Sequence, residues 1–430
     1  MGLRPKISTL VAVALLIEAA HARAENSSIA PNHTTPAALV RQALANNPEL
    51  KFYAAEIGAA EGALKTAGTI RNPELNTQAG YKNARDNFGG PSGEGGAWSI
   101  SINQTFEYPG RIALRKAIAK GDIDLARLHL QQFRLTLAAR VRTLAYSISI
   151  AQERSMAARE VADRFQALSD VLAHRPPAGT TPLLETRIID ANTLNFRRQE
   201  LEAALAAKTA VAELNQLCGR RPADAALQVR AGELNLLEMS LQTLVDAARA
   251  NAFDIRIRQR ELAQQGFKVA LARNERFPAI AVGPYYLQEN AVEKEHQAGI
   301  GISLPLPLWD RNIGNIETSK ARQEQAQASL LATQRDVERR VTQSAATFEV
   351  KREQIANWQV DTVAKFRQAA ELADRNYRLG AVALPVYVET QKQYLEIIGA
   401  LQEMKKDALQ AAQELEILTS LKLYREEERP

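Results

Sequence analysis

The sequence predicts an α/β membrane protein that is mostly α-helical and is built as a tandem internal repeat. Three observations support this fold class. Two long stretches have helical periodicity and contain almost no helix-breaking residue, four short segments alternate apolar and polar residues, and the chain repeats itself once. We therefore expect four membrane strands per chain, continued by long coiled-coil helices.

Residues 1–24 have the features of a secretory signal. Arg4 and Lys6 precede an apolar segment, and Ala22-Arg23-Ala24 has the small-x-small pattern of a cleavage site. The apolar segment is short for a membrane span, and an N-terminal membrane helix is the alternative. We expect an exported protein whose mature unit is 25–430.

Composition excludes several classes of function. Removal of the signal, which carries a net charge of +2, lowers the net charge of the chain from +5 to +3, which is close to neutral and argues against a nucleic-acid partner. The single cysteine, Cys218, excludes an internal disulfide. It lies in "QLCGR", which is typical of a helix end closed by Gly219, so we expect a buried thiol. No long apolar run follows residue 24, so a membrane role requires strands.

The repeat relates residues 37–219 to residues 240–424. The matching segments are "ALANNPEL" at 43–50 with "ARANAFDI" at 248–255, "SINQTFEYPGR" at 101–111 with "GISLPLPLWDR" at 301–311, and Glu185-Thr186 with Glu389-Thr390. The offset between the halves is 205 before the strands, 200 after them and 204 at the last match. A tandem duplication explains this pattern.

Each half is expected to contain a helix, two strands, a very long helix and a further helix. The expected helices are 37–71, 112–174 and 183–218 in the first half, and 240–276, 313–379 and 386–424 in the second. A helix of about 63 residues is a rod of about 95 Å, too long for a compact domain. Apolar residues recur at spacings of four and three residues, as in a coiled coil. These helices must therefore pack on each other or on other copies of the chain.

The expected strands are 74–83, 97–106, 279–288 and 297–306. Each has the length that a tilted strand needs to cross a bilayer. In the second strand, Trp98, Ile100 and Ile102 alternate with polar residues. Four strands cannot close a barrel, whereas three copies would supply twelve, so the strands predict a homotrimer. The alternative is a soluble sheet that caps a helical bundle.

Prolines mark the ends of two strands. Pro109, Pro305 and Pro307 are expected at the junction between barrel and helices, because proline cannot extend a strand ladder. Asp310 or Asn312 is expected to cap the helix that follows.

The chain resembles TolC-type outer-membrane efflux factors over essentially its whole mature length. The resemblance rests on the repeat, the strand–proline–helix junctions and "NYRLGAVALPVYVETQKQYLE" at 376–396; "PLPLWDRNIGNI" at 305–316 resembles the CzcC/CusC-like branch of heavy-metal RND systems. It implies a homotrimer with a twelve-stranded barrel in outer-membrane lipid and a helical tunnel of about 100 Å in the periplasm. The implied partners are a periplasmic adaptor protein and an inner-membrane RND pump.

The resemblance also implies roles for residues at the two helical breaks. Leu379, Gly380, Ala381, Gly179 and Thr180 resemble the turns that meet the adaptor, although a plain helix stop is the alternative. The residues expected at a periplasmic gate or selectivity ring are Glu389, Glu185, Asp374, Tyr377 and Arg378. Three copies of Glu389 would form a ring that favours cations; the alternative is a solvated surface glutamate.

No motif of a hydrolase, a P-loop enzyme or a cysteine-ligated metal protein is found, so we expect neither an enzyme nor a cofactor. Glu293, Glu295 and His296 lie in a loop where a metal site could be imagined, but solvated charge is the preferred interpretation. The leading hypothesis is an outer-membrane channel that exports heavy-metal cations. The alternatives are a channel for drugs or peptides and a periplasmic coiled-coil scaffold or adaptor.

Overall fold

A computed structural model of the chain describes residues 34–85, 87–174, 180–224, 229, 232–291, 293–358 and 361–427. The predicted signal segment 1–24 lies outside the described residues. The elements in the first half are α2 (Pro36–Asn46), α3 (Glu49–Ala67), β1 (Glu74–Arg85), β2 (Pro91–Phe106), α4 (Arg111–Ala173) and α5 (Thr180–Leu217). Those in the second half are β3 (Glu233–Leu236), α6 (Leu241–Asn251), α7 (Phe253–Asn274), β4 (Ile280–Asn290), β5 (Lys294–Ser303), α8 (Ile313–Asn357), α9 (Thr362–Arg378), α10 (Leu384–Thr419) and β6 (Tyr424–Glu427).

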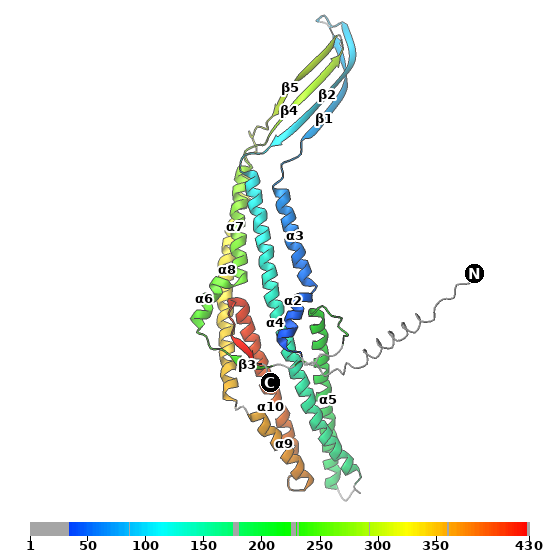
Figure 1. Cartoon of the computed structure of the whole chain (residues 1–430), viewed down its shortest axis with the longest axis vertical. Helices are drawn as coiled ribbons and strands as arrows, with labels where there is room; N and C mark the ends of the chain where they lie inside the picture. The colour runs from blue at the N-terminus through cyan, green and yellow to red at the C-terminus, as the bar shows by residue number, and fades with distance from the viewer. Residues whose placement is uncertain are drawn as a thin grey trace, which may run out of the picture.

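The molecule is elongated, with a sheet at one end and two helix pairs at the other (Figure 1). The antiparallel sheet has the order β1-β2-β4-β5, so strands from both halves lie in one layer. The α4–α5 and α9–α10 pairs end together at the opposite end, which we call the tip (Figure 1). The predicted fold class, mostly helical with a small sheet and a tandem repeat, is confirmed.

The helices that open the two halves correspond at an offset of 205. The side chain of Thr35 accepts a hydrogen bond from the backbone N–H of Ala38 at the start of α2, and Ser240 accepts one from Thr243 at the start of α6. The prediction of single helices over 37–71 and 240–276 was wrong. Both are interrupted, at Asn47 and at Ala252, where the backbone is extended. Asn47 precedes Pro48, and the residue before a proline disfavours helical backbone.

The second long helix is also interrupted, contrary to the predicted helix over 313–379. α8 ends at Asn357, Trp358 has extended backbone, and α9 begins at Thr362. Neither proline nor glycine marks this position, so the sequence pattern gave no sign of it. α10 stops at Thr419 rather than at 424, because β6 pairs with β3 in a small second sheet that the sequence analysis missed.

Two segments that were expected to lie outside the strands are part of them. The glycine-rich segment before residue 97 is part of β2, and Glu295 and His296 lie in β5 rather than in a loop. The sequence predicted an offset of 200 between the two strand–helix junctions, but the structure gives 202. Gly110 before α4 and Asn312 before α8 are the equivalent residues, because both have left-handed backbone. The registers of the β1–β2 and β4–β5 hairpins agree with the offset of 202.

α4 lies at the centre of the helical layer and packs on α2, α3, α5, α7 and α10. Three apolar clusters follow its length: one with α2 and α5, one around α6, α8 and α10, and one at the tip. Cys218 is buried in the first of these, where burial raises the pKa of its thiol, as expected for an inert cysteine. Among the described helices, none has the length and apolar character needed to cross a membrane.

Candidate functional site at the helical tip

The turn between α9 and α10 is shaped by one glycine. Gly380 has a φ of 74° and donates its N–H to the carbonyl of Tyr377 (2.9 Å), while Ala381 donates to the carbonyl of Asn376 (2.9 Å). This pair of bonds is the Schellman arrangement, in which glycine adopts the left-handed region without strain. Leu379 beside it is 75% exposed. Leu379, Gly380 and Ala381 therefore form a solvent-facing turn at the end of the molecule.

Stacked aromatic rings hold the two helix pairs together behind this turn. Phe165 of α4 lies 5.0 Å from Phe196 of α5 and 4.9 Å from Tyr387 of α10, measured between ring centroids. Tyr377 of α9 stacks on Tyr387 at 5.0 Å. Phe165, Phe196 and Tyr387 have no exposed surface. This cluster is the apolar core of the tip.

Three of the predicted gate residues meet around Tyr387. Asp374 accepts hydrogen bonds from Arg378 Nε (3.0 Å) and from the hydroxyl of Tyr387 (3.2 Å). Burial raises the pKa of Tyr387, and the neighbouring Asp374 carboxylate raises it further. The hydroxyl therefore stays protonated and keeps its role as a donor. Sequence reasoning missed Tyr387 because its position in an apolar helical segment is typical of a core residue.

An ion-pair network ties α4 to the second helix pair. Arg164 of α4 lies 2.7 Å from Glu160 on its own helix and 3.8 Å from Glu371 of α9. It also donates to Gln391 of α10 (3.3 Å). Arg367 of α9 completes the network with contacts of 3.4 Å to both Glu160 and Glu371. None of these residues was predicted, since the contacts that join α4 to α9 and α10 link residues more than 200 positions apart in sequence.

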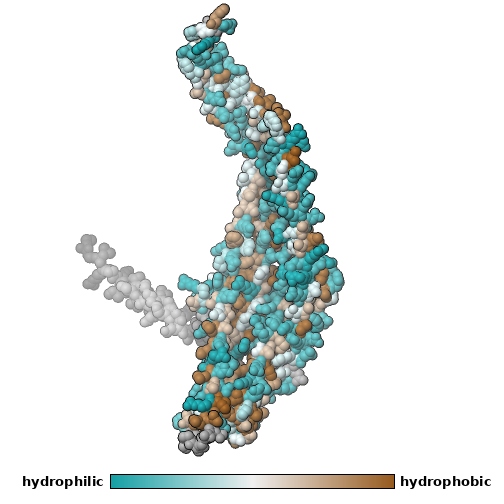
Figure 2. All heavy atoms as spheres, turned by 180° about the vertical axis from the view of Figure 1, so that it is seen from behind, coloured by the Kyte–Doolittle hydropathy of each residue, from teal (hydrophilic) through white to brown (hydrophobic). Residues whose placement is uncertain are grey.

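The remaining predicted tip residues lie on helix surfaces or outside the described chain. Glu389 is exposed on α10 and accepts a hydrogen bond from Gln393 (3.1 Å), and Glu185 is half-buried on α5. Gly179 lies outside the described residues, and Thr180 begins α5 with its side chain outside the description. Hydrophobic surface gathers at the tip (Figure 2), where Leu372, Leu379 and Val386 are more than half exposed.

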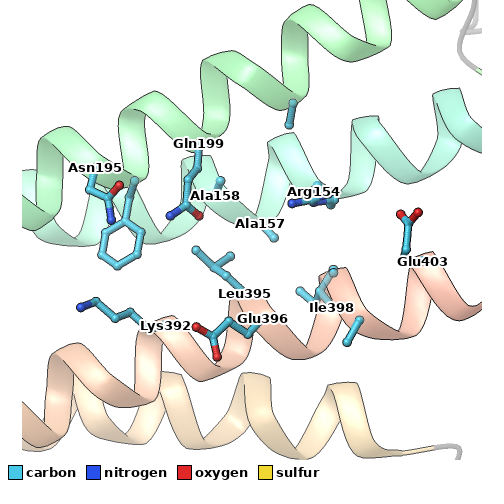
Figure 3. Close-up of a pocket in the computed structure, with 14 residues that line it drawn as sticks. Arg154, Ala157, Ala158, Asn195, Gln199, Lys392, Leu395, Glu396, Ile398 and Glu403 are labelled. Atoms are coloured by element: carbon cyan, nitrogen blue, oxygen red, sulfur yellow. The ribbon is translucent and has the colours of Figure 1, made fainter.

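Above the tip, a groove of about 510 Å³ opens over α4 between α5 and α10. Ala157 and Ala158 of α4 lie at its floor, while Asn195 and Gln199 of α5 face Lys392 and Glu396 of α10 (Figure 3). Its walls come from three separate helices, so no local sequence motif predicted the groove. Its mixture of alanine, amide and charged side chains favours neither cations nor anions.

The predicted junction prolines lie between strands and helices. Pro109 stands between β2 and α4, and Pro305 and Pro307 stand between β5 and α8. Arg111 fastens the first junction to the second half by donating to the carbonyls of Asn274 (3.1 Å) and Phe277 (2.7 Å).

The expected side-chain cap of α8 is not formed by Asp310 or Asn312. Asp310 instead accepts the N–H of Asn312 (2.9 Å), and the Asn312 side chain donates to the carbonyl of Ala272 (2.8 Å). Asn312 Oδ1 accepts a hydrogen bond from the side chain of Asn315 (2.6 Å) rather than from a backbone N–H of α8, so the Asn312 side chain links the first turn of α8 to the end of α7.

The two faces of the sheet differ in polarity. Directly paired residues share a face, and the pairs Leu75–Ile102, Thr77–Ile100, Ile100–Tyr286 and Pro284–Ile300 form an apolar face. The pairs on the opposite face include Asn76–Ser101, Gln78–Ser99 and Glu289–Glu295. Tyr81 and Trp98 stand towards the far end of the apolar face. This pattern suits a strand wall with lipid on one side and water on the other.

The described residues contain no group of three or more His, Cys, Asp or Glu side chains that could hold a metal ion. His296, one of the loop residues considered above, shares a hydrogen bond of 2.6 Å with the hydroxyl of Tyr286.

Comparison with known proteins agrees with this architecture. The chain is 26% identical to the cobalt-zinc-cadmium resistance protein CzcC of Cupriavidus metallidurans over 322 residues, which is 72% of each protein. Among solved structures, the CmeC outer membrane channel of Campylobacter jejuni superposes with a TM-score of 0.71 at 18% identity, over 89% of this chain and 85% of that one. CusC, described as a transmembrane channel, gives a TM-score of 0.67 at 16% identity over 90% and 92%.

The sequence model of the outer membrane efflux protein family matches the chain twice, at residues 39–220 and 244–420. These two matches reproduce the tandem repeat and cover most of the chain. The expected family and the expected location, the outer membrane with an extension into the periplasm, are confirmed. The chain belongs to the outer membrane efflux protein family.

Proposed function

We propose that this protein is the outer-membrane duct of a tripartite efflux system and exports heavy-metal cations. The observation that carries the proposal is the separation of two surfaces on one chain. The sheet, which has one apolar face, lies at one end of the molecule, and the tip lies at the other (Figure 1). At the tip, aromatic packing and ion pairs join the two helix pairs. The unbroken α4 alone has 63 residues, a length of about 95 Å, which is enough to reach far into the periplasm.

The assembly that we propose is a homotrimer. Three four-stranded sheets would supply the twelve strands of a closed barrel, with the apolar face towards outer-membrane lipid. The mature domain would be 25–430 after removal of the signal 1–24. Pro109, Pro305 and Pro307 would then mark the level at which barrel passes into helical tunnel.

The partners that we propose are a periplasmic adaptor and, through it, an inner-membrane RND pump. Leu379, Gly380 and Ala381 form an exposed turn at the tip, which supports a docking role for them; Gly179 and Thr180 would belong to the corresponding turn of the first half. Asp374, Tyr377 and Arg378 would hold the gate, and Glu389 and Glu185 would line the aperture.

The similarity to CzcC, whose name refers to cobalt, zinc and cadmium, supports metal cations as the substrate class. The alternatives are a duct for drugs or peptides, which the shared fold would serve equally well, and a periplasmic scaffold. Disruption of the gene tests the substrate: growth should fail at metal concentrations that the parent tolerates, and re-expression should restore it. Unchanged metal tolerance with increased drug sensitivity would favour the first alternative.

The scaffold alternative is tested on the purified protein. We expect it to require detergent and to have the mass of three chains, about 140 kDa after removal of the signal. A monomer that stays in solution without detergent would contradict the duct.

A further inference from the structure

The polar face of the sheet carries a single aromatic ring among the described residues of β1, β2, β4 and β5, that of Tyr285. Directly paired residues share a face, and Tyr285 of β4 pairs with Ser101 of β2 and with Gly299 of β5. Ser101 pairs in turn with Asn76 of β1. The Tyr285 ring therefore lies at one level with two short polar side chains and a glycine.

The ring of Tyr285 lies against the backbone of β5. A Cβ built on Gly299 would stand 2.9 Å from Cε1 of Tyr285 and 3.0 Å from both its Cζ and its hydroxyl oxygen. Gln297, two residues along β5 on the same face, donates a hydrogen bond from Nε2 to this hydroxyl (3.2 Å). These contacts hold the ring across the neighbouring strand instead of letting it project from the sheet.

Gly299 is needed for the ring rather than for the backbone. Its φ lies outside the left-handed region that favours glycine, so other residues could adopt its conformation. Glycine inside a strand weakens the strand and often marks a close approach. Because any Cβ at Gly299 would meet the ring at 2.9 Å, the glycine provides the space in which Tyr285 lies.

The internal repeat shows that this arrangement is not needed to build the hairpin. The offset is 205 from β1 to β4 and 202 from β2 to β5, so Gly80 corresponds to Tyr285 and Ala97 corresponds to Gly299. Gly80 and Ala97 pair directly, as their counterparts do. A Cβ built on Gly80 would have no heavy atom within 4 Å. The first hairpin therefore forms with open space where the second carries a ring.

We propose that Tyr285 sets the width of the water-filled passage at the level of the sheet, and that Gly299 and Gln297 are positioning residues that keep its ring against the wall. This proposal rests on the trimer of the proposed function, in which the polar faces of three sheets line the passage. Three rings then stand at one level. A ring released from β5 projects into the passage and narrows it, and pore width controls which solutes pass.

Cysteine labelling in intact cells that express the protein tests this arrangement. Ser99→Cys and Thr105→Cys place reporters on the polar face of β2, on either side of Ser101. A reagent added outside the cells meets position 99 first and has to pass the Tyr285 rings to reach position 105. The probe is a maleimide that carries a polyethylene glycol chain, and Cys218 is buried. The measured quantity is the labelling rate at position 105 divided by the rate at position 99.

Gly299→Val places a side chain where the ring lies, so the ring must leave the wall. We expect the rate ratio to fall about tenfold. Adding Tyr285→Ala to Gly299→Val should restore the ratio of the parent, because the displaced ring, and not the valine, obstructs the passage. A ring that only stabilises the sheet would give no such rescue. Gly80→Val is the matched control, since it adds the same side chain to the same face in open space and should leave the ratio unchanged.

The outcomes separate this proposal from its foundation. An unchanged ratio in Gly299→Val, an equal fall in Gly80→Val, or a double variant that stays slow would overturn the role of Tyr285. If Gly299→Val does not assemble, Gly299→Ala replaces it, since its Cβ alone requires the ring to shift; a fall of less than about twofold would then overturn the proposal. A parent in which Ser99→Cys does not react even with a small cationic methanethiosulfonate would instead refute the water-filled passage, and the proposed duct with it.

Discussion

The two halves of the molecule share a plan but differ in how firmly their long helices are held. α4 is continuous over 63 residues and is buried at intervals along its whole length. The equivalent path in the second half is divided into α8 and α9, and α8 buries only Val337, Val341 and Phe348. The duplicated plan has therefore produced one continuous long helix and one divided one, and the two helix pairs meet through side chains at the tip.

The largest expected effect is at the ring stack that joins the two halves. Tyr387→Ala removes a fully buried ring that stacks on Phe165 and Tyr377, and such a cavity costs about 3–5 kcal/mol. We expect a several-fold rise in single-channel conductance and faster proteolysis at the tip. A conductance equal to that of the parent would contradict a closure held by this stack.

A smaller opening is expected from the ion-pair network. Arg164→Ala leaves Arg367 as the remaining partner of Glu160 and Glu371 and removes the hydrogen bond to Gln391 of α10. Loss of this largely buried partner costs about 1–3 kcal/mol. The matched control is Arg140→Ala, which breaks a pair with Glu213 inside the first half. Conductance should rise for Arg164→Ala alone. Equal rises in both variants would mean that any lost ion pair loosens the protein.

The hydroxyl of Tyr387 should contribute a pH dependence. Its pKa is raised in the folded protein by burial and by Asp374, so its contribution to stability is complete below pH 10, the ordinary value, and is lost progressively above it. Tyr387→Phe removes the bond to Asp374, which is worth about 1 kcal/mol, and also the titrating group. Thermal melts at pH 9 and pH 11 should differ more for the parent than for this variant. If the melting temperature falls equally in the parent and in Tyr387→Phe between pH 9 and pH 11, other titrating groups cause the loss of stability.

The smallest effect is expected from Arg378→Ala. The guanidinium is 41% exposed and pairs with Asp374 within one helix, and solvent screening limits such a pair to about 0.5–1 kcal/mol. Arg198→Ala, which removes a same-helix pair with Glu202 in the first half, is the control. We expect a modest increase in conductance for Arg378→Ala only. Conductance unchanged in this variant would remove Arg378 from the gate.

The fold was largely predictable because periodicity and duplication are visible in one sequence. Alternation predicted the strands, and the two matching halves predicted a shared plan. The helix interruption after Asn357 could not be predicted, since no proline or glycine marks it. The offset of 200 was misleading because "YPGR" and "LWDR" align as letters, whereas the left-handed residues Gly110 and Asn312 align in space.

The candidate site was predictable only in part, because only some of its residues are close together in sequence. Asp374, Tyr377 and Arg378 share one short segment, so a local motif revealed them. Their partner Tyr387 lies on α10, and Arg164, which donates to Gln391 of α10, lies on α4. An apolar helix position and a surface-like arginine join the candidate site only when α4, α9 and α10 are packed together.

Channel recording of the detergent-extracted protein in a planar bilayer tests the central claim most directly. We expect a small, cation-favouring conductance for the parent and a larger one for Tyr387→Ala and Arg164→Ala, with Arg140→Ala like the parent. Absence of any channel activity from a correctly folded trimer, or a wide conductance that none of these substitutions changes, would contradict a duct closed at the helical tip.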